Sequence, residues 1–337
     1  MGVNWTRGEA DPAGAGSVSA GQRPSSTMRH RRTRTPPVPA RAGIFPRRIH
    51  LCAGQPLVDA LKTAQRMIPA DLEAAARAGD IVDSRGRPLR LDEPAPGIAY
   101  VHSAAPDEPG YTDPLEIVWS SPRARIVNKP AGIATIPRGS HIACTVTTAA
   151  RRQWGNDSAT PAHRLDRLTS GLLLIVTDPT FRGAYQTLFD RRAVEKTYRA
   201  VTGCRGPLPR PGMSRELRVR LARARGEAKV RPCPDGKLAL TEAKVTAVDE
   251  DRRLLEWSLR PRTGLTHQLR VSLAVAGFPI LGDPLYGSLD PRPACLDGTL
   301  HLHAASLSLR DPVDGQDITC HAPPPWGDLE RVTIPAV

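Results

Sequence analysis

The chain has 337 residues, of which 40% are hydrophobic, so it can bury one large domain or two smaller ones. Its net charge of +13 favours polyanionic partners such as nucleic acids. The six cysteines are scattered without a CxxC pair, which argues against a disulfide framework or a zinc cluster. No apolar run has the length of a signal peptide or a membrane span, so we expect a cytoplasmic protein with reduced thiols and no membrane partner.

Residues 1–48 are predicted to form a disordered basic arm. The segment is poor in apolar residues, rich in Pro, Gly and Ser, and contains nine arginines against two acidic residues. More than half of the net positive charge therefore lies here. The residues leave two interpretations open: an arm that lengthens contact with RNA phosphates, or a leader without a role in the folded protein.

A small module of helices and a hairpin is predicted over residues 49–105. Residues 55–80 place apolar side chains near helical spacing, with Pro69 between two short helices. The stretch IVDSRGRPLRL alternates apolar and polar residues around a turn at Arg85 and Gly86, which predicts a hairpin. The acidic, proline-rich stretch AAPDEPGYTDP that follows indicates a linker.

Residues 115–330 are predicted to form the main domain, of the α+β class. Short apolar strands alternate with Gly and Pro, and helices are expected near residues 141–153, 179–192 and 266–277. Because many strands are interrupted by few helices, we expect a mainly antiparallel mixed sheet flanked by helices and loops. The predicted strands are LEIVWS, ARIVNKP, GLLLIVT, KTYRAVTG, ELRVRLAR, LTEAKVTAVDE, RLLEWSLRP and LHLHAASLSL.

Several enzyme classes lack their motifs in this sequence. There is no GxGxxG after a strand, no GxxxxGK[ST], no HExxH and no GxSxG, so no nucleotide cofactor is expected. His301 and His303 alternate in LHLHA, but no third ligand follows at a suitable spacing. We expect these histidines to be structural and the protein to hold no metal.

The stretch HRLDRLTSG at 163–171 carries the most informative carboxylate, Asp166. An aspartate in such a loop is often only a turn or capping residue. Here Arg164 and Arg167 would stabilise its ionised form, and Thr-Ser-Gly permits a tight turn. The apolar strand GLLLIVT would give the loop a rigid base. These features favour a reactive carboxylate, either a nucleophile or a base.

Five blocks in this order resemble the RluA-type pseudouridine synthases, over roughly residues 115–325. They are RIVNKPAGI, HRLDRLTSGLLLIVT, EKTYRAV, RTGLTHQLRVSL and PILGDPLYG. The resemblance implies the pseudouridine synthase fold and an isomerase that converts uridine to pseudouridine in structured RNA. It implies no cofactor, because the bonds broken and formed lie within one substrate. Ribosomal RNA is the favoured partner and transfer RNA the second, and we expect a monomer.

The resemblance also implies roles for individual residues. Asp166 matches the essential aspartate that attacks or activates the ribose, and Arg270 matches the arginine that pairs with it. Tyr198 matches the tyrosine that stacks on uracil and is a candidate for removing the final proton. Arg164 matches a residue that fills the space left by the flipped nucleotide, a task that base-flipping enzymes require. From the residues alone, Tyr198 also suits an amphipathic strand and Arg270 a helix surface.

Four more residues are predicted to bind RNA or uridine by their place in these blocks, namely Lys129, Arg167, His267 and Gln268. Lys129 lies at a turn set by Pro130 and Gly132, and its contact with RNA is implied by the family. His267 and Gln268 have the alternative of only orienting their loop. Gly282, Asp283 and Gly287 are expected to be turn residues.

Two departures from the family and two rival functions remain. Leu265 stands where the family commonly has an arginine, and ATIPRGSH at 134–141 replaces its more usual His-Pro-Gly segment. The module at 49–105 loosely resembles a small RNA-binding domain of ribosomal-protein type. One rival function is a catalytically inactive RNA-binding or ribosome-assembly protein. Another is a glycosidase using Asp166 and Asp178, which an extended strand would place roughly 20 Å apart, too far for that chemistry.

Overall fold

The computed structural model describes residues 37–64, 71–102, 111–138, 141–204, 206–224, 226–287 and 300–332. Of the predicted arm, residues 1–36 lie outside this described part. Residues 37–48 do have a described conformation, because Arg41 and Ile44 pair through their backbones and β1 begins at Arg47. The folded part of the chain therefore begins before residue 49.

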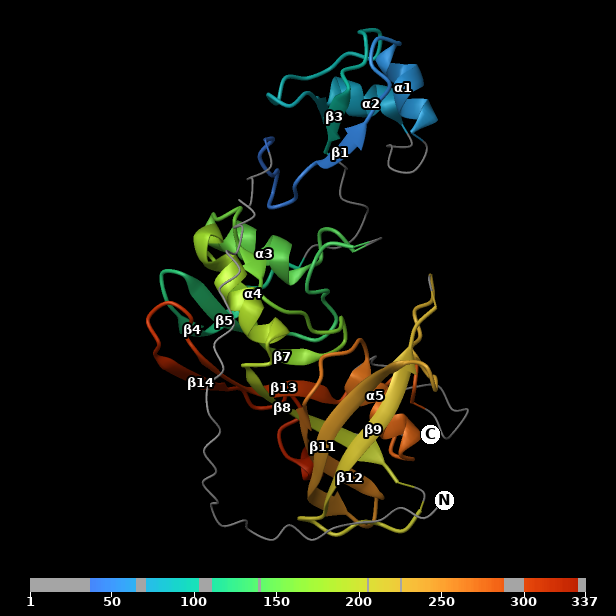
Figure 1. Cartoon of the computed structure of the whole chain (residues 1–337), viewed down its shortest axis with the longest axis vertical. Helices are drawn as coiled ribbons and strands as arrows, with labels where there is room; N and C mark the ends of the chain where they lie inside the picture. The colour runs from blue at the N-terminus through green and yellow to red at the C-terminus, as the bar shows by residue number, and fades with distance from the viewer. Residues whose placement is uncertain are drawn as a thin grey trace, which may run out of the picture.

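A small module with its own core occupies residues 47–101 and forms the blue to teal region at the top of Figure 1. Its three-stranded antiparallel sheet has the order β1-β3-β2. The predicted turn is confirmed, since Gly86 has φ +80° and the Asp83 carboxylate accepts hydrogen bonds from two backbone N–H groups after it. Its elements are β1 (Arg47–His50), α1 (Leu57–Thr63), α2 (Leu72–Arg77), β2 (Ile81–Val82) and β3 (Ile98–Val101).

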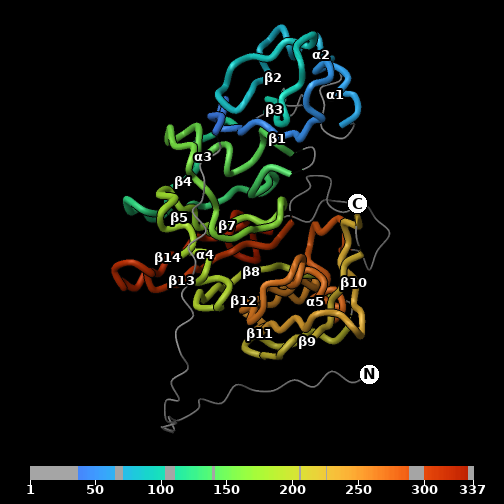
Figure 2. The backbone as a smooth tube through the Cα atoms, turned by 45° about the horizontal axis from the view of Figure 1, so that its top comes forward, coloured from blue at the N-terminus to red at the C-terminus, as the bar shows by residue number. Residues whose placement is uncertain are grey.

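The segment before β1 contacts the main domain. The Gly43 carbonyl accepts a hydrogen bond of 3.1 Å from Nη1 of Arg151, and the Arg151 guanidinium lies 4.7 Å from the centre of the Phe45 ring. Arg151 belongs to α3 (Val146–Trp154). The segment before β1 thus connects the module to the main domain through contacts on α3, and Figure 2 shows the two next to each other. Residues 103–110 of the predicted linker lie outside the described part.

The main domain is built on one eleven-stranded sheet. Its main path runs β10-β9-β11-β12-β8-β13-β7-β5-β4, with β14 paired to β13 and β6 to β7. Among the described pairs, β7 and β13 are parallel and the others antiparallel, which confirms the predicted α+β class with a mainly antiparallel mixed sheet. The strands are β4 (Glu116–Ser120), β5 (Ala124–Lys129), β6 (Thr160–Pro161), β7 (Ser170–Val176), β8 (Glu195–Gly203), β9 (Ser214–Ala222), β10 (Arg231–Pro232), β11 (Lys237–Asp249), β12 (Leu254–Pro261), β13 (Leu302–Arg310) and β14 (Asp317–His321).

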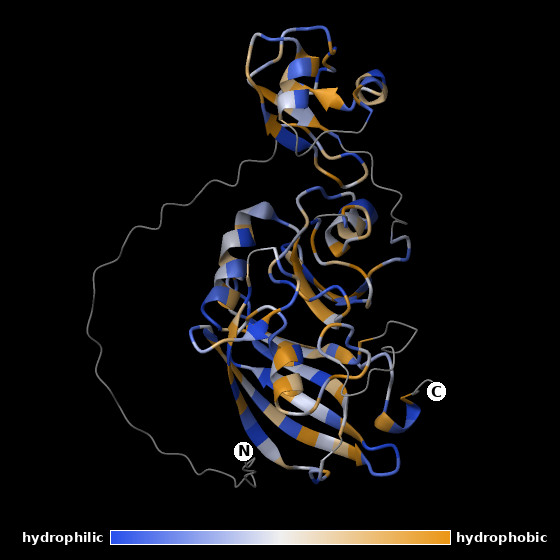
Figure 3. Ribbon diagram, turned by 90° about the vertical axis from the view of Figure 1, so that its right-hand side faces the viewer, coloured by the Kyte–Doolittle hydropathy of each residue, from blue (hydrophilic) through white to orange (hydrophobic). Residues whose placement is uncertain are grey.

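The helices lie in two groups, one with each half of the sheet. In Figure 1, α3 and α4 (Arg182–Asp190) lie with β5 and β7, whereas α5 (Gln268–Val275) lies with β9, β11 and β12. Short 3-10 helices, η1 (Pro179–Phe181) and η2 (Leu329–Arg331), complete the fold. Figure 3 shows apolar and polar residues alternating along the strands, the pattern expected when one sheet face is buried. Among the described residues, no helix is long and apolar enough to cross a membrane.

The two halves meet where β7 pairs with β13, and a glycine makes that contact possible. Gly171 has φ +109°, and a Cβ atom added there would lie 2.4 Å from the Ala304 carbonyl oxygen. Only glycine combines this conformation with such close approach. Gly171 is the last residue of HRLDRLTSG, so the same glycine that joins the halves ends the loop carrying Asp166.

Candidate active site

A cleft of about 880 Å³ opens where the two halves meet. Asp166, Tyr198 and Arg270, which lie far apart in the sequence, all line it. Its lining contains two carboxylates, Asp166 and Asp190, and six cationic side chains, which are Arg138, Arg164, Arg167, Lys196, Arg223 and Arg270. An excess of cations suits a polyanionic ligand.

The loop that carries Asp166 is held by its backbone on both sides of the aspartate. The hydroxyl of Thr135 donates to the Leu165 carbonyl at 2.7 Å and accepts from the Leu165 N–H at 3.1 Å. The Arg167 carbonyl accepts from the backbone N–H of Gly132 at 2.9 Å. The side chain of Asp166 between these anchors is 28% exposed. The fold therefore presents a carboxylate from a fixed loop into the cleft.

Lys129 contributes to this loop from beneath, which corrects the prediction that it contacts RNA. Its side chain is fully buried, and Nζ donates to the carbonyls of Pro130 (2.8 Å), Ile133 (2.9 Å) and Arg167 (3.1 Å). Three carbonyl groups use all three protons of an ammonium, so none remains for a phosphate. Burial lowers the pKa of Lys129 to about 7, against the attraction of the Asp166 charge.

Arg270 faces Asp166 from the first turns of α5, as predicted. Its Nη1 donates to Oδ2 of Asp166 at 3.2 Å, while Nε and Nη2 donate to the two carboxylate oxygens of Asp283, both at 2.7 Å. The side chain is 4% exposed. A buried guanidinium requires a partner charge. Asp283 supplies this charge by binding Nε and Nη2 of the guanidinium. The third nitrogen, Nη1, remains to contact Asp166 at the cleft.

Asp283 is the functional residue that the sequence prediction missed, since we expected it only to form a turn. It does form one, because its carboxylate accepts from the backbone N–H groups of Leu285 and Tyr286. Burial alone would raise the pKa of Asp283, but the hydrogen bonds and charge of Arg270 outweigh burial and lower it overall. The block PILGDPLYG was the available signal, yet the block does not reveal which residue the carboxylate meets.

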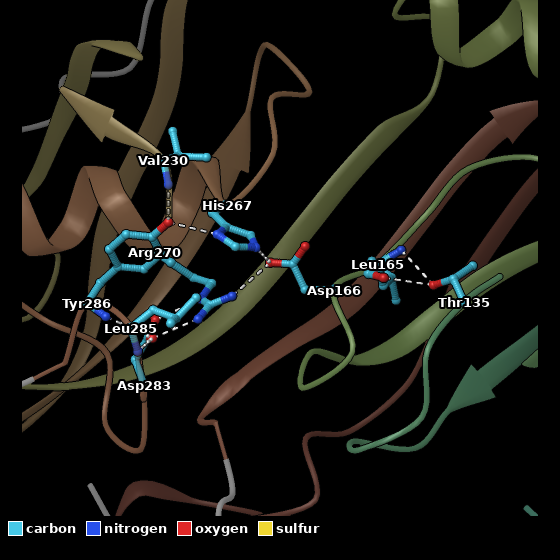
Figure 4. A network of polar contacts seen from close by, with 9 residues as sticks. All are labelled: Thr135, Leu165, Asp166, Val230, His267, Arg270, Asp283, Leu285 and Tyr286. Atoms are coloured by element: carbon cyan, nitrogen blue, oxygen red, sulfur yellow. Dashed lines mark hydrogen bonds and ion pairs between the residues drawn. The ribbon is translucent and has the colours of Figure 1, made fainter. Parts of the chain in front are cut away.

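A second series of polar contacts leads to Asp166 through His267, as Figure 4 shows. The backbone N–H of Val230 donates to the Tyr286 oxygen at 2.7 Å, and that hydroxyl lies 2.7 Å from Nδ1 of His267. If the hydroxyl donates to Nδ1, neutral His267 carries its proton on Nε2, which lies 3.8 Å from Oδ2 of Asp166. Burial lowers the pKa of His267 against the attraction of Asp166, which favours this neutral form.

Tyr198 and the two flanking arginines occupy different environments. Tyr198, on β8, lines the cleft with 9% of its surface exposed. Burial first, and the negative charge of Asp166 second, raise the pKa of its hydroxyl well above the usual range. Arg164 and Arg167 are exposed at the cleft. The cleft thus has a buried aromatic ring in its lining and two exposed cationic side chains.

Gln268 lines the cleft but its amide group is already fully bonded, which corrects the prediction of a uridine contact. Its oxygen accepts from the Thr263 hydroxyl and the Leu265 N–H, and its nitrogen donates to the Leu240 carbonyl and the Thr241 hydroxyl. These bonds fasten the start of α5 to β11. Leu265, which stands where the family commonly has an arginine, packs against an apolar cluster and also lines the cleft.

Residues weighed for other chemistries lie in structural environments. His303 bonds with the Ser170 hydroxyl at 2.9 Å and with the Ala322 carbonyl at 3.1 Å, and the His301 ring lies 5.2 Å from that of Trp326. No group of three potential metal ligands occurs among the described residues. Asp178 caps η1 through the Thr180 N–H and does not line the cleft, so it forms no pair with Asp166 there.

Comparisons with known proteins find relatives of one family. A family model described as RNA pseudouridylate synthase matches residues 124–275. The ribosomal large subunit pseudouridine synthase D of Haemophilus ducreyi is 30% identical over 234 residues, covering 65% of this chain and 70% of the relative. The dual-specificity RNA pseudouridine synthase RluA of Escherichia coli is 33% identical over 214 residues, covering 62% and 93%. Human RNA pseudouridylate synthase domain containing 1 superimposes with a TM-score of 0.52 at 26% identity, over 65% of this chain and 87% of that structure.

Proposed function

The chain belongs to the RluA-type family of RNA pseudouridine synthases, which are isomerases, and on that premise we propose that it converts uridine to pseudouridine in ribosomal RNA with Asp166 as the reactive carboxylate. The observation that supports this best is the partly exposed Asp166 carboxylate, 3.2 Å from the Arg270 guanidinium that Asp283 holds in place, in a cation-lined cleft. Ribosomal RNA is favoured because relatives are named for the ribosomal large subunit. Transfer RNA is the second candidate, since one relative is named dual-specificity.

The proposed reaction breaks the bond between N1 of uracil and the ribose and forms a bond from C5 to the same ribose carbon. A proton leaves C5 and one is gained at N1, so the reaction balances within one nucleotide. Asp166 attacks or activates the ribose, and Arg270 holds a fixed positive charge 3.2 Å from its carboxylate. Arg164 fills the gap left by the flipped nucleotide, and Arg167 contacts RNA beside it.

Tyr198 is proposed to hold the uracil by stacking. Its raised pKa keeps the hydroxyl protonated at neutral pH, which supports stacking more strongly than removal of the C5 proton. We assign positioning roles to three of its neighbours. Lys129 fixes the Asp166 loop, Gln268 fixes the start of α5, and His267 directs a proton toward the aspartate.

The small module is proposed to add RNA contacts outside the cleft. It has its own apolar core and presents exposed arginines, among them Arg48, Arg85 and Arg87. The arm at 1–48 would extend the same contacts. Measuring RNA affinity after deletion of residues 1–105 tests this, and unchanged affinity would remove the proposal.

The test of the main proposal uses the purified protein and an Asp166→Asn variant. Each is incubated with unmodified ribosomal and transfer RNA, and pseudouridine is quantified by mass spectrometry of the digested nucleosides. Asparagine keeps the shape and removes the reactive charge. We expect product from the wild type alone, and more from ribosomal RNA. If neither protein forms product on RNA that a known synthase modifies, the inactive RNA-binding alternative replaces the proposal.

A further inference from the structure

Lys196 lines the same cleft as Asp166 but has no part in the reaction described above. It lies on β8 two residues before Tyr198. Successive side chains of a strand point to opposite faces, so residues two apart share a face, about 6.6 Å from each other along the strand. Lys196 therefore stands beside the ring proposed to carry the uracil.

The ammonium of Lys196 has no anionic partner within the described residues. Nζ of Lys196 lies over the ring of Phe189, 5.8 Å from its centre. Arg199, three residues after Lys196 on the same strand, faces the other side of the sheet and pairs with Glu256. Arg270, across the cleft, pairs with two carboxylates. Lys196 differs from both because its charge is left uncompensated.

The surroundings of Lys196 make its positive charge energetically unfavourable in the protein without RNA. The side chain is partly buried, and burial lowers its pKa. Its positive charge is also felt at His163, whose pKa falls to about 3 through burial first and Lys196 second. His163 is therefore neutral and cannot repel a ligand. A partly desolvated cation without a partner is favourable only when an incoming anion supplies one.

We propose that Lys196 binds a backbone phosphate of the RNA next to the flipped uridine. This assignment rests on the proposed function, in which the uridine stacks on Tyr198. The phosphate is the anion that accompanies a nucleotide into the cleft, and an ammonium binds it as a point charge. The Phe189 ring holds the ammonium from one side by a cation–π contact, which leaves its protons available to the ligand.

The experiment combines a Lys196→Met variant with synthetic RNAs in which one phosphate beside the target uridine is an uncharged methylphosphonate, placed 5′ or 3′. Single-turnover pseudouridine formation and equilibrium RNA affinity are both measured. Lys196→Met should lower kcat/KM on unmodified RNA about 10- to 100-fold, the scale of a charged hydrogen bond. At one of the two linkages, the methylphosphonate should lower kcat/KM of the wild type by a similar factor. The same methylphosphonate should lower kcat/KM of the Lys196→Met variant little. Lys196→Arg should retain most of the activity.

Lys244→Met is the matched control, since Lys244 is an exposed lysine on β11 that does not line the cleft. It should respond to both methylphosphonates as the wild type does. If the losses from Lys196→Met and from each methylphosphonate multiply independently, the lysine only packs against Phe189 and the assignment is overturned. The affinity measurement does not require turnover. If the wild type forms no pseudouridine, the proposed function fails while the binding data still decide whether Lys196 meets a phosphate.

Discussion

Asp166 and Asp283 bind the same guanidinium from two regions of the molecule and differ in almost every other respect. Asp283 is buried, forms two bonds of 2.7 Å to Arg270 and accepts two backbone N–H groups. Asp166 lies on the loop before β7, is 28% exposed in its side chain and forms one bond of 3.2 Å to Arg270. One aspartate is structural and the other remains available.

This difference indicates how a carboxylate can be paired with an arginine and still stay accessible. If Arg270 had Asp166 alone as its partner, the two side chains would form a close bidentate pair that occupies both carboxylate oxygens. Asp283 takes that geometry instead and orients the guanidinium. Arg270 then acts on Asp166 as a fixed positive charge at longer range. The Asp166 carboxylate stays partly exposed at the cleft, as the proposed attack on the ribose requires.

The largest effect on stability is expected when Asp283 is changed. Asp283→Asn removes the charge that compensates buried Arg270, so the free energy of unfolding should fall by about 3 to 5 kcal/mol. Asp166→Asn should lower it by less than about 1 kcal/mol, because that carboxylate is partly exposed. Urea denaturation of the three proteins measures both changes. Equal losses would show that the two aspartates share the structural role.

The same pair predicts a dependence of stability on pH. The pKa of Asp283 is lowered in the folded protein, so its contribution is fully present above about pH 4, the usual range of an aspartate. It is lost as the pH falls through the lowered pKa. The difference in stability between wild type and Asp283→Asn should therefore shrink in acid. A constant difference down to the acid transition would contradict the ion pair.

An intermediate effect is expected from the residue that holds the Asp166 loop. Lys129→Met keeps the length of the side chain but leaves three buried carbonyl groups without a donor, so stability should fall by about 2 to 3 kcal/mol. Single-turnover rate should fall as well, because the loop is no longer fixed. Proteolysis within residues 163–171 should accelerate in the variant. Unchanged rate together with lost stability would mean that Asp166 is positioned without Lys129.

Lys129 also predicts a pH effect, of the same sign as that of Asp283 but in a higher pH range. Burial lowers its pKa to about 7, whereas a lysine in the unfolded chain titrates near about 10.4. Between these values the unfolded chain binds a proton that the folded protein has released, so the contribution of Lys129 to stability rises with pH. The stability difference between wild type and Lys129→Met should grow from pH 7 to pH 9. A flat difference would place the folded pKa near its ordinary value.

Much of the fold could be predicted because the alternation of apolar and polar residues along a strand indicates which side chains are buried. All eight predicted strands exist, as do the helices expected in the main domain. The strands that were missed include β6 and β10, each of two residues, and β14. Such short pairings are determined by the neighbouring strand and not by a pattern of their own. The loop with Asp166 was recognisable because its arginines, turn residues and apolar strand lie together in the sequence.

The site was predicted where residue type determines the role and missed where a distant contact determines it. The pairing of Asp166 with Arg270 followed from the family resemblance, and the structure places the two within hydrogen-bond distance. Lys129 was predicted to contact RNA because the family places its turn near the site, and nothing in the local sequence shows that its side chain is buried. Its burial depends on carbonyl groups that include one from Arg167, far along the chain. Asp283 was missed for the same reason, since nothing near it in the sequence indicates Arg270.

The smallest effect is expected at the second series of polar contacts, where Tyr286→Phe removes one hydroxyl. That change removes the hydroxyl that links the Val230 N–H to Nδ1 of His267. It keeps the aromatic ring of residue 286, whose centre lies 5.1 Å from the Arg270 guanidinium carbon. Loss of one buried hydrogen-bonding group should cost about 1 kcal/mol of stability and no more than about fivefold in rate. Because Asp283 still fixes Arg270, the hydrogen bond from Arg270 to Asp166 should persist. A rate loss as large as that of Asp166→Asn, with stability intact, would instead place the proton of His267 in the reaction itself.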